Sequence, residues 1–203
     1  MDRLNAIGKF SVLCLVLILW TACGPAEWKG HYVSGHGYEV HFEIPKPFRR
    51  TSEAIYFEET GRTLYEEGYV TYGDEEHKFQ VRVMEQGVGS WKMDGVTPRS
   101  LLEYALGREN AGADKMLEVH EFTDPNWPET VSPSEEFTIE SADGETIRHT
   151  RVVIYQAPPG RESYGCYVLF TASRPKDEPR SVDVDRFFNS LKICTRDKLP
   201  SGC

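Results

Sequence analysis

The stretch EFTIESADGETIRHTRVVIYQ, Glu136 to Gln156, is the part of the sequence that decides the fold. Apolar and polar residues alternate on both sides of its centre, which is typical of two half-buried β-strands. The pair Asp143-Gly144 predicts the turn between them, because glycine adopts a positive φ without steric cost. The sequence therefore predicts a β-hairpin here, and a hairpin with an apolar face has to pack against a further layer.

Antiparallel strands are predicted on both sides of this hairpin. The segment YEVHFEI, Tyr38 to Ile44, alternates apolar and polar residues along its whole length. The segment 53–85 reads as three strands, with turns at Thr60-Gly61 and Gly73-Asp74. Further strands are predicted at 116–122 and 164–173.

Two helices accompany these strands. Thr97 can cap the first, and Pro98 suits its first helical position. The second starts at Val182 and is predicted to run to Cys194, because its apolar residues recur with helical spacing at Val184, Phe187, Phe188 and Leu191. The order of elements predicts an α+β domain with helices covering an antiparallel sheet.

The sequences of these segments, and their order along the chain, resemble those of the PsbP-like family. The resemblance rests most on the pair Glu136-Phe137 before the hairpin and on the closing FFNSLKI, Phe187 to Ile193, and it covers roughly residues 36–194. It implies a PsbP-like α/β/α sandwich. Family members are mostly non-catalytic binders or assembly factors. Relatives often carry a glycine-rich turn where this chain has VSPSE, residues 131–135, so any function tied to that turn is not carried over.

The N-terminus has the pattern of a secretory signal. Residues 1–9 include Arg3 and Lys9, the run FSVLCLVLILW (residues 10–20) is apolar apart from one serine, and Thr21-Ala22 are small. The apolar run would span roughly 17 Å as a helix, which is short of a bilayer core of about 30 Å. The pattern therefore predicts export of the chain and not a permanent membrane span.

Cys23 follows directly, and Leu19 to Cys23 resembles the lipobox of bacterial lipoproteins, with Trp20 where the family usually has leucine. The resemblance implies that Cys23 carries acyl chains, and two or more chains give stable anchoring. It implies a protein of the bacterial cell envelope that is lipid-anchored to a membrane. Gly24 in place of an aspartate favours the outer membrane, with the domain facing the periplasm. An ordinary cleaved signal and an uncleaved anchor remain alternatives.

The chain divides into four predicted regions. A lipoprotein signal peptide at 1–22 precedes a tether at 23–37, where four glycines and a proline break any periodic pattern. The α+β domain is predicted at 38–194, and a C-terminal tail at 195–203.

Three cysteines remain outside the signal and the lipidation position, and an oxidising compartment allows a disulfide. Cys166 lies near the start of a predicted strand, and Cys194 at the end of the helix expected to fold back on it. That geometry favours a Cys166–Cys194 bond. A Cys194–Cys203 bond and three unpaired thiols stay open as alternatives.

Nothing in the sequence predicts catalysis, a metal site or a cofactor. The six histidines lack zinc-type spacing, no phosphate-binding loop is present, and the glycines before Ser90 do not form a nucleophile elbow. A net charge of −9 argues against a nucleic-acid partner, because phosphate backbones are bound by basic clusters.

The interpretation that remains is a non-enzymatic binding or assembly factor of the envelope with a protein partner. Trp91 and Trp127 are candidates for the contact surface, since tryptophan often anchors interfaces; packing inside the domain is the alternative for both. A small-ligand or metal-binding lipoprotein is the second hypothesis, and an enzyme is the third.

Overall fold

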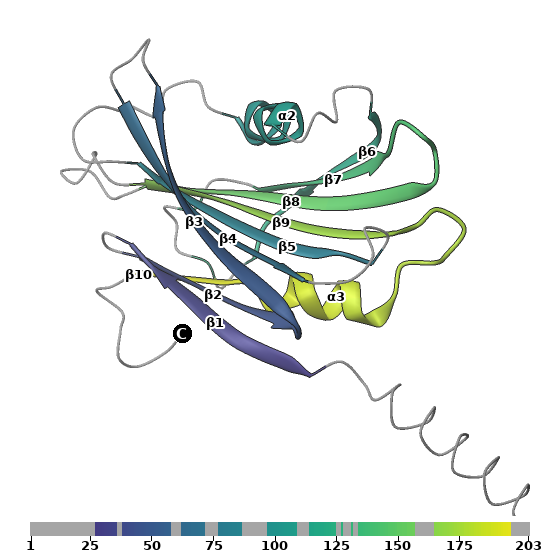
Figure 1. Ribbon diagram of the computed structural model, residues 1–203, viewed down its shortest axis with the longest axis horizontal. Coiled ribbons are helices and arrows are strands. Elements are labelled where there is room, and N and C mark those ends of the chain that lie inside the picture. Colours follow the sequence, from purple (N-terminus) through teal and green to yellow (C-terminus); the bar gives the residue numbers. More distant parts are fainter. Residues whose placement is uncertain are drawn as a thin grey trace, which may run out of the picture.

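The computed structural model describes residues 27–35, 38–57, 62–71, 77–86, 97–108, 114–124, 127, 131, 134–156 and 165–195. Within these residues the chain forms two antiparallel sheets and two helices (Figure 1). The small sheet has the order β1-β2-β10, with β1 (Trp28–Ser34), β2 (Tyr38–Pro45) and β10 (Lys192–Thr195). The large sheet has seven strands in the order β3 (Phe48–Phe57), β4 (Arg62–Thr71), β5 (Phe79–Gln86), β9 (Gly165–Pro175), β8 (Thr146–Gln156), β7 (Ser134–Glu140) and β6 (Lys115–Phe122).

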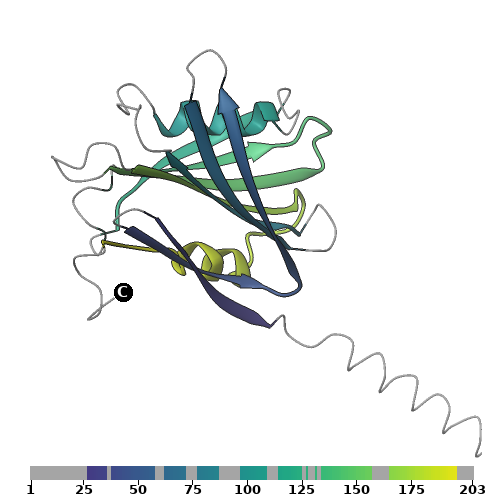
Figure 2. The same cartoon turned by 60° about the vertical axis from the view of Figure 1, so that its left-hand side comes forward.

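The large sheet is covered on both faces (Figure 2). Helix α2 (Pro98–Arg108) lies on one face, where Leu102 packs in a buried cluster with Phe137 and Ile154. Helix α3 (Val182–Asn189) and the small sheet lie on the other face. There the ring centroid of Phe187 is 4.8 Å from that of Phe170 in β9. The main core lies between the two sheets.

Local signals in the sequence correspond to these elements. The predicted hairpin is the pair β7–β8, and Gly144 in its turn has a φ of 76°. Thr97 caps α2, because its Oγ1 accepts from the backbone N–H of Ser100 at 3.1 Å. Ser181 caps α3 by accepting from the N–H of Val184 at 3.3 Å. The antiparallel, strand-rich character of the α+β prediction is confirmed.

The layer arrangement differs from a sheet covered by helices alone. Only part of each face of the large sheet lies under a described helix, and the small sheet forms much of the second layer. Valine, phenylalanine and isoleucine on the inner side of β2 supply the apolar surface that a helix was expected to supply: Val40, Phe42 and Ile44 are each at most 2% exposed.

The predicted tether is wrong over most of its described length. Strand β1 lies inside 23–37 and pairs with β2 from Trp28 opposite Pro45 to Ser34 opposite Glu39. Val33 is 8% exposed and belongs to the main core. The glycine content suggested a flexible segment, yet Gly30 sits in open space on this edge strand, where a missing side chain leaves no hole in the core. The domain therefore begins before residue 38.

The predicted Cys166–Cys194 disulfide is also wrong. Helix α3 ends at Asn189, and the chain then joins the small sheet, where Cys194 lies opposite Glu39. Cys166 lies in the large sheet, between Glu85 and Tyr155, as a buried free thiol. Cys194 is disulfide-bonded, but not to Cys166. Cys203 lies outside the described residues, so its pairing with Cys194 stays a prediction.

The signal segment 1–22, Cys23 and the tail beyond residue 195 lie outside the described residues. Among the residues that are described, neither helix is long and apolar enough to cross a bilayer.

Candidate functional site

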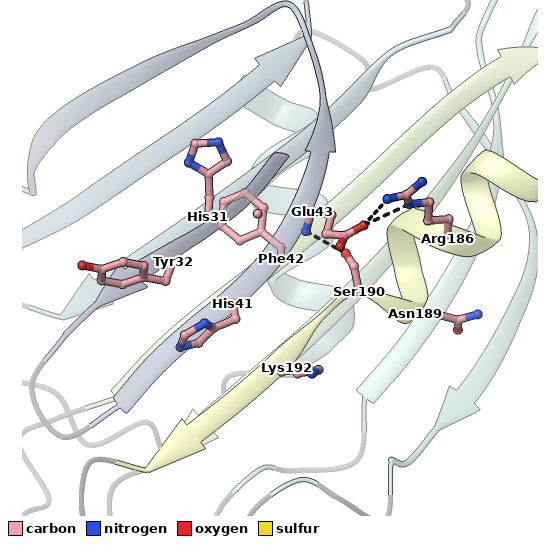
Figure 3. A pocket seen from close by; sticks show the side chains of 10 residues that line it. His31, Tyr32, His41, Phe42, Glu43, Arg186, Asn189, Ser190 and Lys192 are labelled. Atoms are coloured by element: carbon pink, nitrogen blue, oxygen red, sulfur yellow. Dashed lines mark hydrogen bonds and ion pairs between the residues drawn. The ribbon is translucent and has the colours of Figure 1, made fainter. Parts of the chain in front are cut away.

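A pocket of about 540 Å³ opens on the outer side of the small sheet (Figure 3). It lies where strands β1, β2 and β10 meet the end of helix α3. Its lining residues are Gly30, His31, Tyr32, His41, Phe42, Glu43, Arg186, Asn189, Ser190 and Lys192. A volume of this size falls within the range of small-molecule sites, roughly 300 to 1,000 Å³.

The alternation of strand β2 explains why the pocket is polar. Its inward side chains enter the core, so Glu39, His41 and Glu43 face outward. The register of the sheet then places Tyr32 of β1 and Lys192 of β10 opposite His41, one on each side. Two consecutive strands and one strand from near the end of the described chain thus share one outer face.

An aromatic pair forms one side of the pocket. The rings of Tyr32 and His41 are stacked, with centroids 5.6 Å apart and an angle of 25° between planes. His41 Nε2 lies 2.9 Å from Glu39 Oε2, and Ser34 donates to the other carboxylate oxygen at 3.1 Å. The histidine ring is therefore held in place, while Tyr32 is 63% exposed. The pair offers a flat, partly apolar surface to a ligand.

A network of polar contacts fixes the other side. Glu43 accepts from Arg186 Nε at 2.9 Å and from its terminal nitrogen at 2.8 Å, as Figure 3 shows. Ser190 Oγ accepts from the backbone N–H of Glu43 at 2.9 Å and donates to the carbonyl of Phe187 at 2.7 Å. Arg186 also lies over the ring of Trp28, 4.6 Å from its centroid. The end of α3 is thereby attached to the small sheet.

One cation of the pocket, Lys192, is not held in an ion pair with any residue that the structure describes. Glu43 balances Arg186, and Lys192 has no ion-pair partner among the described residues. The second carboxylate beside the pocket, that of Glu39, is in contact with His41, so the ammonium of Lys192 is the charged group left for a ligand. Lys192 and the exposed Asn189 can bind a polar or acidic group. Ser190 already donates and accepts, so its hydroxyl is not placed as a nucleophile.

His31 lines the inner wall and is surrounded by aromatic rings. Its ring centroid is 4.7 Å from that of Phe48, 5.6 Å from that of Tyr69 and 5.9 Å from that of Phe42. Burial lowers the pKa of His31, and the nearby positive charge of Lys29 lowers it further. This histidine acts as a neutral packing residue. No group of three metal-ligating side chains occurs among the described residues.

A second polar cluster is buried between α3 and strands β7 and β8. Arg151 donates to Glu136 at 2.8 Å and to the carbonyl of Phe188 at 3.1 Å. Arg180 binds the other oxygen of Glu136 and also Asp185. Burial acts to raise the pKa of Glu136, but the hydrogen bonds from Arg180 and Arg151 outweigh it and lower that pKa. Each carboxylate here is paired, which indicates a structural role.

His149 neighbours this cluster and is buried as well. Arg174 Nε donates to its Nε2 at 3.3 Å, so that nitrogen is unprotonated. Burial, together with the charges of Arg180 and Arg174, lowers the pKa of His149 to about 4. The imidazole is therefore neutral across the physiological range.

The structure does not bring the residues predicted for binding into this pocket. Trp127 is half-buried, and its ring packs edge-on against Phe122 with centroids 5.5 Å apart. That contact favours the packing alternative for Trp127. Trp91 and Cys23 lie outside the described residues. The pocket residues were not predicted, although the outward side of the alternating segment 38–44 was the signal that could have found them.

Comparisons with known proteins add little to this geometry. No protein-family model matches the sequence, and no curated protein matches it. The structure is similar to that of LpqN, described as involved in cell envelope biogenesis of Mycobacterium tuberculosis. The two are 12% identical with a TM-score of 0.45, over 82% of this chain and 91% of that one.

A second similar structure is the cyanobacterial PsbP (CyanoP) of Synechocystis sp. PCC 6803. It is 13% identical with a TM-score of 0.47, over 85% of this chain and 95% of that one. At these values neither likeness carries an argument about function. Membership of the PsbP-like family stays an expectation from the sequence, and the fold itself is a strand-rich α+β domain with two antiparallel sheets.

Proposed function

We propose that this protein is an exported, lipid-anchored protein of the cell envelope that binds another envelope component without chemical turnover. The observation that carries the proposal is the position of the pocket relative to the expected anchor. Strand β1 begins at Trp28, five residues after Cys23. Five extended residues span at most about 18 Å. A lipidated Cys23 would hold the pocket strands close to the membrane surface.

The arrangement of the pocket supports binding over catalysis. Its two acid–base pairs, Glu43–Arg186 and Glu39–His41, are already bonded within the protein. What remains for a partner is the exposed ring of Tyr32, the amide of Asn189 and the ammonium of Lys192. An aromatic surface beside a cation is typical of recognition sites.

A binding experiment in cells tests this proposal. A photo-crosslinking amino acid is introduced at Tyr32 or at Lys192, and a matched control carries it at Asp177, which is exposed in the turn after β9. One discrete crosslinked species from both pocket positions and none from Asp177 is the expected result. The Cys23→Ser variant should release the protein from membranes and lose that species. Equal crosslinking from all three positions would refute the pocket as the binding surface.

The anchor is tested separately by intact mass. The protein is extracted from membranes in detergent without reductant. A chain that starts at Cys23 and carries diacylglyceryl or three acyl groups is expected. An unmodified chain cut at another position would remove the anchor from the proposal and leave only a soluble binding protein.

The volume of the pocket favours a second candidate function, a small-ligand lipoprotein. In that case no discrete protein crosslinks, while a low-molecular-mass envelope extract raises the melting temperature of the wild-type protein and not of the Lys192→Ala variant. A ligand present at 100 times its Kd stabilises by about 2.7 kcal/mol, which thermal denaturation resolves.

A further inference from the structure

Strand β6 forms one edge of the seven-stranded sheet, at the end opposite β3 (Figure 1). It pairs with β7, and no strand lies on its other side among the described residues. None of its eight residues is buried. Leu117 is 40% exposed and Val119 is 38% exposed. An edge strand of this length presents unpaired backbone donors and acceptors, together with apolar side chains, to whatever binds there.

The charges on this edge are not balanced within the protein. Glu121 of β6 lies directly opposite Glu135 of β7, and neither carboxylate has a cationic partner among the described residues. Like charges directly opposite each other destabilise a sheet. The pair Glu53 and Glu66 has the same placement near the other edge, but there Arg82 donates to Glu66 at 2.9 and 3.1 Å.

We propose that β6 is a docking edge that takes an extended, basic segment of a partner protein as an additional strand. Backbone hydrogen bonds to the free edge would supply affinity, and alternate side chains would supply specificity. A lysine or arginine of the added strand would neutralise the facing carboxylates of Glu121 and Glu135. Its apolar side chains would cover Leu117 and Val119.

The charge of β6 itself argues for a partner over a second copy. The strand carries Glu118 and Glu121 against the one cation Lys115. A second β6 strand would bring further carboxylates to an edge that already has an uncompensated pair. A basic segment removes that repulsion. This edge belongs to the large sheet and shares no residue with the pocket on the small sheet, so the inference stands whether or not the pocket function holds.

The probe is a capped, fluorescent peptide with the repeat Val-Thr-Lys-Thr, and the protein is the full chain in detergent. Val119 and Glu121 lie on the same face of β6, and this repeat places valine and lysine alternately along one face of the added strand. Binding is measured by anisotropy, and backbone hydrogen exchange is followed by mass spectrometry. The expected result is binding together with slower exchange in residues 115–122. The same peptide N-methylated at alternate residues keeps its charge and loses its strand-pairing N–H groups, so it should not bind. The same repeat with aspartate in place of lysine should not bind either.

Charge reversal at the edge gives the matched pair of variants. Glu121→Lys should weaken peptide binding about five-fold, because one favourable cross-strand charge contact becomes unfavourable. Its melting temperature should rise, since Glu135 gains an opposite charge. Asp177→Lys makes the same charge change on an exposed turn and should leave peptide affinity unaltered. If Glu121→Lys binds the peptide more weakly and also melts at a higher temperature, the weaker binding cannot come from misfolding of the variant.

Four results of the peptide and exchange experiments would overturn the proposal. They are equal binding of the N-methylated peptide, unchanged exchange in 115–122 on binding, equal effects of the two charge reversals, or slow exchange along the whole of β6 in the free protein. A dimer in solution that Glu121→Lys dissociates would assign the edge to a second copy and would equally overturn it.

Discussion

Replacing Glu136 by glutamine should destabilise the domain by about 3 kcal/mol, because it leaves a buried arginine without its counter-charge. The side chain of Arg151 is 5% exposed and that of Glu136 is 12% exposed. Removing one partner of a buried pair costs about 3 to 5 kcal/mol in general. For Glu136→Gln we expect a loss of stability at the lower end of this range. Glutamine keeps the shape and one acceptor oxygen, while Arg180 is 31% exposed and keeps its contact with Asp185.

Urea unfolding followed by tryptophan fluorescence and circular dichroism measures the change in the free energy of unfolding. The slope against urea should stay as in the wild type, since the surface exposed on unfolding is unchanged. Glu27→Gln is the matched control, because Glu27 pairs with Lys46 at the surface and its side chain is 75% exposed. No measurable change is expected there. A loss below about 1 kcal/mol for Glu136→Gln would refute the idea that Arg151 is buried and depends on Glu136 for its counter-charge.

Three further predictions concern single side chains. The pKa of His149 in the folded protein is about 4, below its ordinary value of 6.5. On acidification the unfolded chain therefore takes up a proton at this residue at a higher pH than the folded protein does. Stability should therefore fall as the pH drops from about 6.5 to 4, by at most about 3 kcal/mol, and a pH series of urea unfolding should show less slope in His149→Gln. Burial raises the pKa of the Cys166 thiol, so iodoacetamide should label Cys166 only in denaturant, as peptide mass mapping would reveal. Ser190→Ala leaves the Glu43 N–H without its acceptor and should cost about 1 kcal/mol in the same unfolding assay, while Ser190→Thr should retain most of that stability.

The strands of the large sheet were predictable because their signals are local. Alternating residues on both sides of Asp143-Gly144 specify the hairpin β7–β8 without reference to the remaining chain. Thr97 and Pro98 specify the start of α2 in the same way. In each case the sequence signal that predicts the element lies within the residues that form it.

The small sheet was not predictable, because its two outer strands carry no clear strand pattern of their own and are defined by their pairing with β2. In strand β1, Lys29, Gly30, Tyr32 and Ser34 are exposed, and this composition resembles a linker until β2 is placed beside it. In β10, Cys194 lies at helical spacing from Leu191, and only pairing with β2 distinguishes a strand from another helical turn. The Cys166–Cys194 error followed directly from extending that helix.

The pocket was missed for the same reason. Tyr32, His41 and Lys192 come from three strands, and no spacing within one segment relates them. The alternation of β2 showed that Glu39, His41 and Glu43 would face away from the core. It did not show that α3 would end beside them.

The pairing of β10 with β2 has a consequence for the order in which the domain matures. The backbone of Glu43 is bonded to a side chain 147 positions further along the chain. Contacts of such long sequence separation form late and slow folding, because a large loop must close before they contribute. Tyr32 and His41 can meet early in synthesis, whereas Arg186, Ser190 and Lys192 arrive only with the last helix and strand. A nascent or truncated chain would therefore lack a complete pocket, and binding there would report that synthesis had reached the end of the domain.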